Sequence, residues 1–387
     1  MNGWANSVVS TVRDVVGRGK IELHEPTISE RDRAVVDDCL RSGYVSSVGE
    51  WVTKFEDALC EYTGAGFAVA MSSGTSALQV CAYAAGVKPG DEVLIPSLSF
   101  VATANAFVHA GAIPHFVDIS PHTLGLDPVS LDNYLEEIAE AGEIGATNKV
   151  TRRRIAAIVP MHCFGHPVEM KSLLTVSAKW GIPVVEDAAE ALGSLRGTDH
   201  MGTLGLVGAI SFNGNKIVTT GGGGAVVTND EKLAKFARHL SATAKVPHSW
   251  EFDHDQVGFN YRMPNLNAAL GWSQLQELES SVMRKRLLAE RYQEAFSDFS
   301  QLEIFREPEG ARSNYWLNAL ILKNQSARFR DQILRIGHDA GIFLRPAWRL
   351  LHRLRPYDNN PRAPLDVSEN LQPRILNLPS SSHLALK

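Results

Sequence analysis

The stretch SFNGNKIVTTGGGG, residues 211–224, places one lysine, Lys216, between an apolar strand and a run of four glycines. The residues GAISF at 208–212 have the small and apolar character of a buried strand. Lysine is seldom fully buried without a partner, so packing alone does not explain this position. An amine held away from water loses its proton more readily, and a neutral amine can form a Schiff base with an aldehyde. The stretch therefore indicates a reactive lysine at the end of a strand.

A second segment, IPVVEDAAEALGS at 182–194, supplies a carboxylate in a similar setting. It begins as an apolar strand that ends at Asp187. An aspartate after a strand can simply cap the following helix. Beside a Schiff-base lysine, however, its carboxylate would keep a pyridinium nitrogen protonated. A lysine and an aspartate in these two roles are the protein's part in pyridoxal phosphate chemistry, so we expect pyridoxal 5'-phosphate (PLP) as cofactor.

Short apolar strands alternate with helical stretches from about residue 65 to 230. This alternation predicts an α/β fold with a mostly parallel sheet, whose ligands lie at the carboxyl ends of the strands. Asp187 and Lys216 both fall at such ends. The predicted strands are 68–71, 92–96, 114–119, 155–160, 182–187, 209–212 and 224–228, and the predicted helices between them are 75–86, 102–111 and 170–181.

Small hydroxyl residues and glycine join the first strand to its helix in AMSSGTSAL, residues 70–78. Amides and hydroxyls at a helix N-terminus can bind a phosphate, although the same residues can serve as an ordinary helix cap. Phe100, in PSLSFVATANA at 96–106, could stack on a planar ring or pack in the core. The segment 70–78 offers Ser72, Ser73, Gly74, Thr75 and Ser76 for a phosphate, and Ser211, five residues before the lysine, could add a hydroxyl.

The chain changes character after about residue 262. A long helical pattern covers 265–296, and it is followed by candidate strands near 302–305 and 315–322 and a helix near 327–340. We therefore predict an N-terminal arm with helices over 1–50, a large PLP-binding domain over 51–262 and a smaller α+β domain over 263–387. Val8, Val12, Val15 and Val16 recur at helical spacing, which suggests a short amphipathic helix that docks on another element.

Composition argues against nucleic-acid-binding, membrane-spanning and metal-binding proteins. The chain has 387 residues and a formal net charge of -5, which argues against nucleic acid as a partner. Its four cysteines form no CxxC pair, and no apolar run is long enough to span a membrane, so a cytoplasmic location is expected. His162 and His166 in HCFGH are four residues apart, but glycine and proline disfavour a shared helix face, and we expect no metal site.

These motifs together resemble the sugar-nucleotide aminotransferases of the DegT/DnrJ/StrS type, within the fold-type I PLP enzymes. SSGTSAL, PSLSFVATANA, VVEDAAEALGS, SFNGNKIVTTGGGG and GFNYRMPNLNAALG at 258–271 follow the family's order over most of the chain. The resemblance implies a seven-stranded sheet, a Schiff base on Lys216, a pyridinium contact from Asp187 and a ring stacked on Phe100. It also implies a homodimer with shared active sites, in which Asn260 reaches the phosphate in the neighbouring subunit.

The closest branch by resemblance is the LegC-like enzymes, which aminate UDP-4-keto-6-deoxy-N-acetylglucosamine. The stretches 25–49, 312–320 and 344–358 carry this likeness. Family analogy then makes Asn314, Tyr315 and Trp316 substrate contacts. Arg345 and the arginines that follow it could meet a diphosphate or form a solvated basic surface. Glu190 stands where many relatives have glutamine or histidine beside the cofactor's phenolic oxygen, and its role stays open.

The expected reaction is a transamination in two halves. L-glutamate, a donor implied only by the resemblance, would convert PLP to pyridoxamine phosphate, which would then aminate the sugar ketone with Lys216 as acid and base. Another GDP- or dTDP-linked sugar, or a 3-keto sugar, is an alternative substrate. A PLP-dependent sugar dehydratase usually has histidine in place of the lysine, and a cofactor-sensing regulator would need a DNA-binding module. A dehydrogenase is disfavoured because no GxGxxG follows the first strand.

Overall fold

The structure is a computed structural model that describes residues 2–142, 145–323 and 327–386. Two hydrogen-bonded sheets meet where parallel bridges join Ile158 to Val184 and Met161 to Asp187. They form one seven-stranded surface in the order β3-β2-β6-β7-β10-β11-β1. Its strands are β1 (Phe67–Met71), β2 (Glu92–Pro96), β3 (Ile113–Val117), β6 (Arg154–Ile158), β7 (Val185–Asp187), β10 (Val207–Ser211) and β11 (Gly224–Thr228).

The predicted α/β architecture is confirmed. Neighbouring strands run parallel, except that β11 runs antiparallel to both β1 and β10. Each predicted strand falls on an observed one, with ends that differ by up to three residues. The largest difference lies at β7, which begins at Val185 because Pro183 has no amide hydrogen to donate to a ladder.

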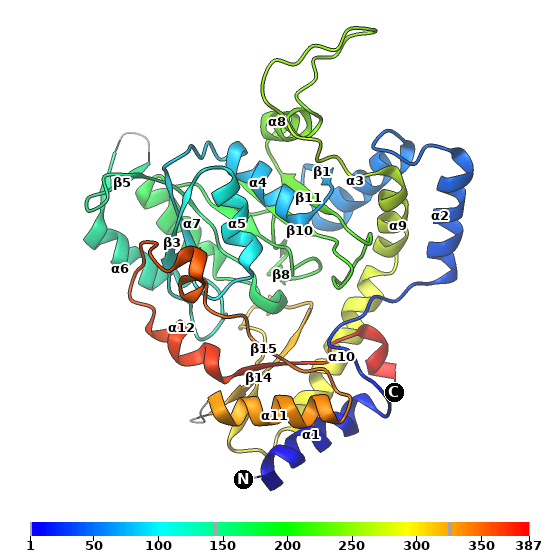
Figure 1. Cartoon of the computed structure of the whole chain (residues 1–387), viewed down its shortest axis with the longest axis vertical. Coiled ribbons are helices and arrows are strands. Elements are labelled where there is room, and N and C mark those ends of the chain that lie inside the picture. Colours follow the sequence, from blue (N-terminus) through cyan, green and yellow to red (C-terminus); the bar gives the residue numbers. More distant parts are fainter. Residues whose placement is uncertain (1, 143–144, 324–326, 387) are drawn as a thin grey trace.

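Helices cover both faces of this sheet (Figure 1). One hydrophobic core joins the sheet to α3, α6, α7 and α9, and a second core joins the opposite face to α4, α5 and α8. Both faces of the strands are therefore buried, as expected for a mainly parallel sheet. These helices are α3 (Glu50–Thr63), α4 (Gly74–Ala84), α5 (Val101–His109), α6 (Pro128–Ile138), α7 (Met170–Trp180), α8 (Glu231–Ser241) and α9 (Asn265–Leu275).

A small antiparallel sheet lies at the other end of the molecule, where α10 leads to it (Figure 1). Its strand order is β12-β14-β16-β15. The elements are β12 (Leu302–Ile304), β14 (Asn318–Leu322), β15 (Arg345–Pro346), β16 (Ile375–Leu378), α10 (Leu278–Ala295), α11 (Ala327–Asp339) and α12 (Asp366–Leu371). The helical pattern predicted over 265–296 is thus two helices, because α9 packs on α3 whereas α10 packs beneath the small sheet.

Both ends of the chain pack with the small sheet. The helix α1 (Asn2–Val16) buries Val8, Val12 and Val16 in the same core as α10 and α11, so the predicted amphipathic helix docks there. The helix α2 (Glu30–Ser42) instead packs on α9. The boundaries at residues 50 and 262 stay predictions.

The remaining elements are short. They are the strands β4 (Ala139–Ala141), β5 (Ala146–Asn148), β8 (Leu195–Arg196), β9 (Asp199–His200) and β13 (Ala311–Arg312), and the 3-10 helices η1 (Cys163–Gly165), η2 (Leu351–Arg353), η3 (Arg355–Tyr357), η4 (Gln372–Arg374) and η5 (Ser382–Leu386). Within the described ranges, no helix has the length and apolar character needed to cross a bilayer.

Candidate active site

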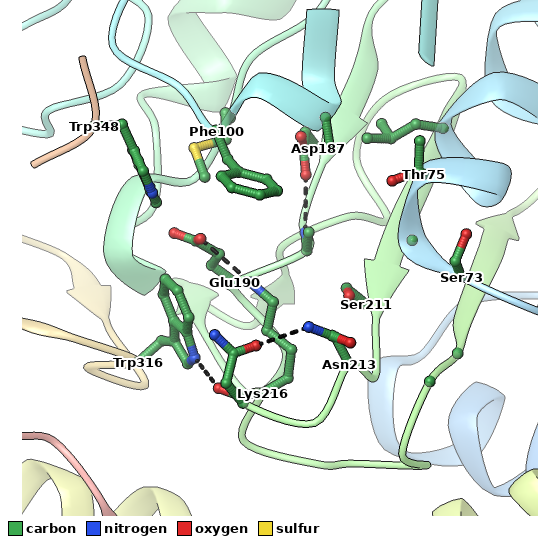
Figure 2. A pocket seen from close by; sticks show the side chains of 18 residues that line it. Ser73, Thr75, Phe100, Asp187, Glu190, Ser211, Asn213, Lys216, Trp316 and Trp348 are labelled. Atoms are coloured by element: carbon green, nitrogen blue, oxygen red, sulfur yellow. Dashed lines mark hydrogen bonds and ion pairs between the residues drawn. The ribbon is translucent and has the colours of Figure 1, made fainter. Parts of the chain in front are cut away.

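A cavity of about 320 Å³ opens at the carboxyl ends of β7 and β10, and Figure 2 shows its lining. Lys216 points into it from the loop after β10, and Asp187 points into it from the end of β7. The structure therefore brings the two residues of the predicted chemistry to one cavity. Ser73, Gly74, Thr75, Phe100, Glu190, Ser211 and Trp316 line the same cavity.

Asp187 is a buried carboxylate whose orientation is fixed. Its Oδ2 accepts a hydrogen bond from Thr103 Oγ1 at 2.6 Å, and its Oδ1 accepts one from Ala189 N at 3.1 Å. Burial raises the pKa of Asp187, and no ion pair found among the described residues includes it. A buried carboxylate without a cation fits a cationic ligand atom such as a protonated ring nitrogen.

The N-terminus of α4 borders the cavity through Ser73, Gly74 and Thr75. Ser73 caps this helix, and its Oγ accepts a hydrogen bond from Ser76 N at 3.0 Å. A Cβ atom added to Gly74 would lie 2.8 Å from Ser211 Cβ, and a Cβ atom added to Gly224 would lie 2.4 Å from Ser73 O. Glycine at both positions allows the helix N-terminus, β10 and β11 to come this close, and amides and hydroxyls at such a terminus suit an anion. The donor set fits the phosphate of PLP.

Lys216 lies between a carboxylate and an indole ring. Its Nζ is 3.3 Å from Glu190 Oε1 and 3.8 Å from the centre of the Trp316 ring. Trp316 Nε1 in turn donates to Asn215 O at 2.9 Å, next to the lysine (Figure 2). The ring therefore covers the amine and fixes the start of the lysine loop.

Two aromatic side chains stand on the far side of the cavity. Phe100 precedes α5 and remains 47% exposed, so it is available to a planar ligand rather than consumed by core packing. The centre of its ring lies 6.1 Å from the centre of the Trp348 ring. The Trp348 ring in turn lies 4.9 Å, centre to centre, from the ring of Phe164. We call Ser73, Gly74, Thr75, Asp187 and Ser211 the cofactor wall, and Trp316 and Trp348 the tryptophan wall.

The other predicted ligands lie outside this cavity. Asn314 is buried behind it, where its Nδ2 donates to Glu190 O and Leu192 O, both at 2.8 Å. The Tyr315 hydroxyl accepts a hydrogen bond from Glu307 N and does not line the cavity. Asn260 is exposed and follows a long loop. Arg345 lines an adjoining cavity. Substrate contacts by Asn314, Tyr315 and Arg345, and a phosphate contact by Asn260 in the neighbouring subunit, stay predictions.

Sequence reasoning missed Thr103 and Trp348. Thr103 lies one helical turn after Ser99, inside a motif that was noted only for Phe100, and its hydroxyl orients Asp187. Trp348 comes from the segment after β15, far along the chain from the motifs of the large sheet. Only its place in LRPAW could have drawn attention to it.

The two histidines of HCFGH take separate structural positions. His162 Nε2 lies 3.0 Å from Glu186 Oε2, whereas His166 packs between Phe305 and Tyr315. Burial lowers the pKa of His166 to about 3. Among the described residues, no group of three histidine, cysteine, aspartate or glutamate side chains is placed to hold a metal ion.

A lysine, a buried aspartate and a helix N-terminus that meet at the strand ends of such a fold are typical of a fold-type I PLP-dependent enzyme. The chain belongs to the DegT/DnrJ/EryC1/StrS aminotransferase family, whose model matches residues 26–387. It is 34% identical to EpsN of Bacillus subtilis, described as a pyridoxal phosphate-dependent aminotransferase, over 94% of this chain and 92% of that protein. It is 32% identical to the GDP-perosamine synthase of Caulobacter vibrioides, over 94% of each.

Solved structures agree with this membership. The aminotransferase TlmJ from Streptoalloteichus hindustanus has a TM-score of 0.84 and 31% identity over 94% of each chain. The sugar aminotransferase Spr1654 from Streptococcus pneumoniae, at 25% identity, is known in PLP and PMP forms, and its PLP form has a TM-score of 0.83 over 94% of each chain. PLP is therefore the cofactor. The assignment of Lys216, Asp187 and the α4 terminus as its ligands stays a prediction that their shared cavity fits.

Proposed function

We propose that this aminotransferase moves the amino group of L-glutamate to the ketone of a nucleotide-linked 4-keto-6-deoxy sugar. The observation that carries the proposal is a second cavity, of about 550 Å³, that adjoins the first and shares Asn215, Trp316 and Trp348 with it. Arg345 and Arg349 line this cavity, and neither forms an ion pair among the described residues. Guanidinium groups without carboxylate partners suit a diphosphate that extends from a sugar at Lys216.

The nucleotide is the finer part of the proposal. The resemblance to LegC-like enzymes favours UDP-4-keto-6-deoxy-N-acetylglucosamine. Three relatives at 31–32% identity are GDP-perosamine synthases, which supports a GDP-linked sugar as the rival. The structural neighbour DesI, at 28% identity, was solved with its TDP-sugar product, which leaves a dTDP-linked sugar as a third choice.

Bound PLP supplies a carbonyl for the lysine and a ring that withdraws electrons from the reacting carbon. The chain's own residues do the rest. Asp187 holds a proton on the ring nitrogen, Lys216 Nζ moves a proton to and from the reacting carbon, and Trp316 keeps water away from that amine. The arginines hold the sugar's phosphates, so that the ketone faces the same amine.

We also propose that the working unit is a homodimer with shared active sites. The segment 243–258 projects beyond α8 (Figure 1), and Trp250, Phe252 and Val257 on it are 77%, 78% and 88% exposed. Large apolar side chains on a projecting segment suit contact with another copy of the chain. Asn260 follows this segment, which supports its role as a ligand donated to the neighbouring site.

The test is a two-step assay with the PLP-loaded protein. L-glutamate alone should bleach the cofactor's absorption band, and the correct keto sugar should restore it and yield an amino sugar nucleotide by mass. Parallel reactions with UDP-, GDP- and dTDP-linked 4-keto-6-deoxy sugars identify the nucleotide. A band that glutamate never bleaches would contradict the donor, and a band that none of the sugars restores would contradict the acceptor class.

A further inference from the structure

Glu190 lies against the reactive amine, yet its surroundings are unlike those of an ordinary ion pair. The residue is 3% exposed and lies on the loop that follows β7. Its main chain is held by Asn314, whose Nδ2 donates to Glu190 O at 2.8 Å. This hydrogen bond fixes the backbone that carries the Glu190 side chain.

The two carboxyl oxygens of Glu190 are not equivalent. Oε2 accepts the amide hydrogen of Phe164 at 2.9 Å, which occupies that oxygen as an acceptor. Oε1 faces Lys216 Nζ at 3.3 Å and lines the cavity (Figure 2). A proton on the carboxyl would therefore lie on Oε1, in reach of the amine, since a protonated Oε2 would lose the Phe164 hydrogen bond or compete with it.

Burial beside Lys216 favours a Glu190 carboxyl that gains and loses its proton near neutral pH. Burial raises the pKa of Glu190 to about 7, and Asp187 adds to the rise while Lys216 opposes it. Burial, helped by the Glu190 charge, raises the pKa of the Cys163 thiol well above its ordinary value. The thiol therefore stays protonated, and the lysine is the group that can exchange a proton with Glu190.

We propose that Glu190 is a catalytic acid–base partner of Lys216, exchanging one proton between its Oε1 and the lysine Nζ. When the amine must act as nucleophile or base, an N–H proton passes to Oε1, the nitrogen keeps the electron pair, and the carboxylate becomes a carboxyl. When the amine must act as an acid, the same proton returns. No oxidant or other reactant is needed. This role goes beyond the proposed substrate, because it concerns only the protein and its cofactor.

Glu190→Gln separates this role from a structural one. The amide oxygen of glutamine can still accept from Phe164 N, so the loop keeps its hydrogen bond, but the side chain no longer takes up a proton. Glu190→Asp keeps the acid and withdraws it from Lys216 by one methylene. Glu277→Gln is the matched control, since Glu277 is exposed on the far side of the lysine loop and does not line the active-site cavity.

The decisive measurement is the infrared band of a protonated carboxyl, recorded on apo and PLP-loaded protein as the pH rises from acid to alkaline values. We expect the wild type and Glu277→Gln to show a band that disappears near pH 7, and Glu190→Gln to lack it. If the wild type shows no such band at any pH, Glu190 is a permanent anion and the proposal is overturned.

A second readout follows single turnover with L-glutamate. Loss of a general acid–base group typically costs about 100-fold or more. We therefore expect Glu190→Gln to slow the half-reaction by about 100-fold with unchanged PLP affinity, and Glu190→Asp to lie between it and the wild type. A Glu190→Gln enzyme that keeps both the wild-type rate and its pH profile would refute the role. Failure of the wild type to react would count against glutamate as donor, and the infrared result would still decide the role of Glu190.

Discussion

The cofactor wall and the tryptophan wall of the cavity are built in different ways. In the cofactor wall, short motifs fix their own functional groups, as when Ser73 caps α4 and Ala189 N binds Asp187 two residues away. In the tryptophan wall, distant segments fix each ring. Trp316 O accepts from Lys285 of α10, and Trp348 packs on Phe164. Local contacts thus hold much of the cofactor wall, with Thr103 as a distant partner of Asp187, whereas the tryptophan wall depends on packing between distant segments throughout.

This difference is clearest at Lys285. Its ammonium is fully buried, with a pKa that burial lowers well below the ordinary value, and it donates to Trp316 O at 3.1 Å and to Ser380 O. No carboxylate pairs with it among the described residues. The main chain of Trp316 is therefore held by a residue 31 positions earlier, which no local motif would reveal.

Lys216→Ala should have the largest effect, because it removes the amine that bonds PLP and moves the proton. We expect turnover to fall below detection while the melting temperature stays within a few degrees of the wild type. The measurement is amino sugar formation by mass, with thermal unfolding as the control for folding. Normal turnover by this variant would contradict the assignment of the reactive lysine.

Asp187→Asn should follow in size. The amide oxygen can still accept from Ala189 N, and the amide NH2 can donate to Thr103 Oγ1 in place of the present bond, but the side chain places no negative charge beside the ring nitrogen. Loss of one preorganised electrostatic contact typically costs about 100-fold or more in rate. Single-turnover kinetics with L-glutamate measure this loss, and Asp37→Asn, on the exposed face of α2, is the matched control. A loss of less than about threefold would mean that Asp187 is only a structural residue.

The same contrast explains what the sequence could predict. The strands, the lysine and the aspartate were predictable, because strand periodicity and the motifs of the cofactor wall lie within short windows. The burial of the Asn314 side chain was not predictable, because it depends on hydrogen bonds to the carbonyls of Glu190 and Leu192. Trp348 and the break between α9 and α10 also depend on packing between distant elements. Propensity alone gives no sign of such contacts.

Trp316→Leu tests the tryptophan wall with a smaller expected effect. Leucine still fills part of the space but loses the ring over Lys216 Nζ and the hydrogen bond to Asn215 O. A cation–π contact of about 0.5–2 kcal/mol corresponds to a loss of about 2- to 30-fold in kcat/KM. PLP affinity should change little, because the cofactor wall is intact. Equilibrium titration with PLP checks this, and a large loss of PLP affinity would show that the two walls are not separable.

Arg345→Ala should have the smallest effect and should act on binding alone. Arg345 is exposed on β15 and lies in the adjoining cavity, away from Lys216. A single solvent-exposed phosphate contact is screened by salt. We therefore expect KM for the nucleotide sugar to rise about 5- to 10-fold at low salt, less at high salt, with kcat unchanged. The glutamate half-reaction should be unaffected.

Arg335→Ala, on the exposed face of α11, removes the same charge from a position outside both cavities and should leave KM unchanged. Equal effects of the two variants would mean that only the overall charge matters. An Arg345→Ala enzyme with lower kcat and unchanged KM would place this residue with the chemistry. The division of labour between the cofactor wall and the small sheet would then not hold.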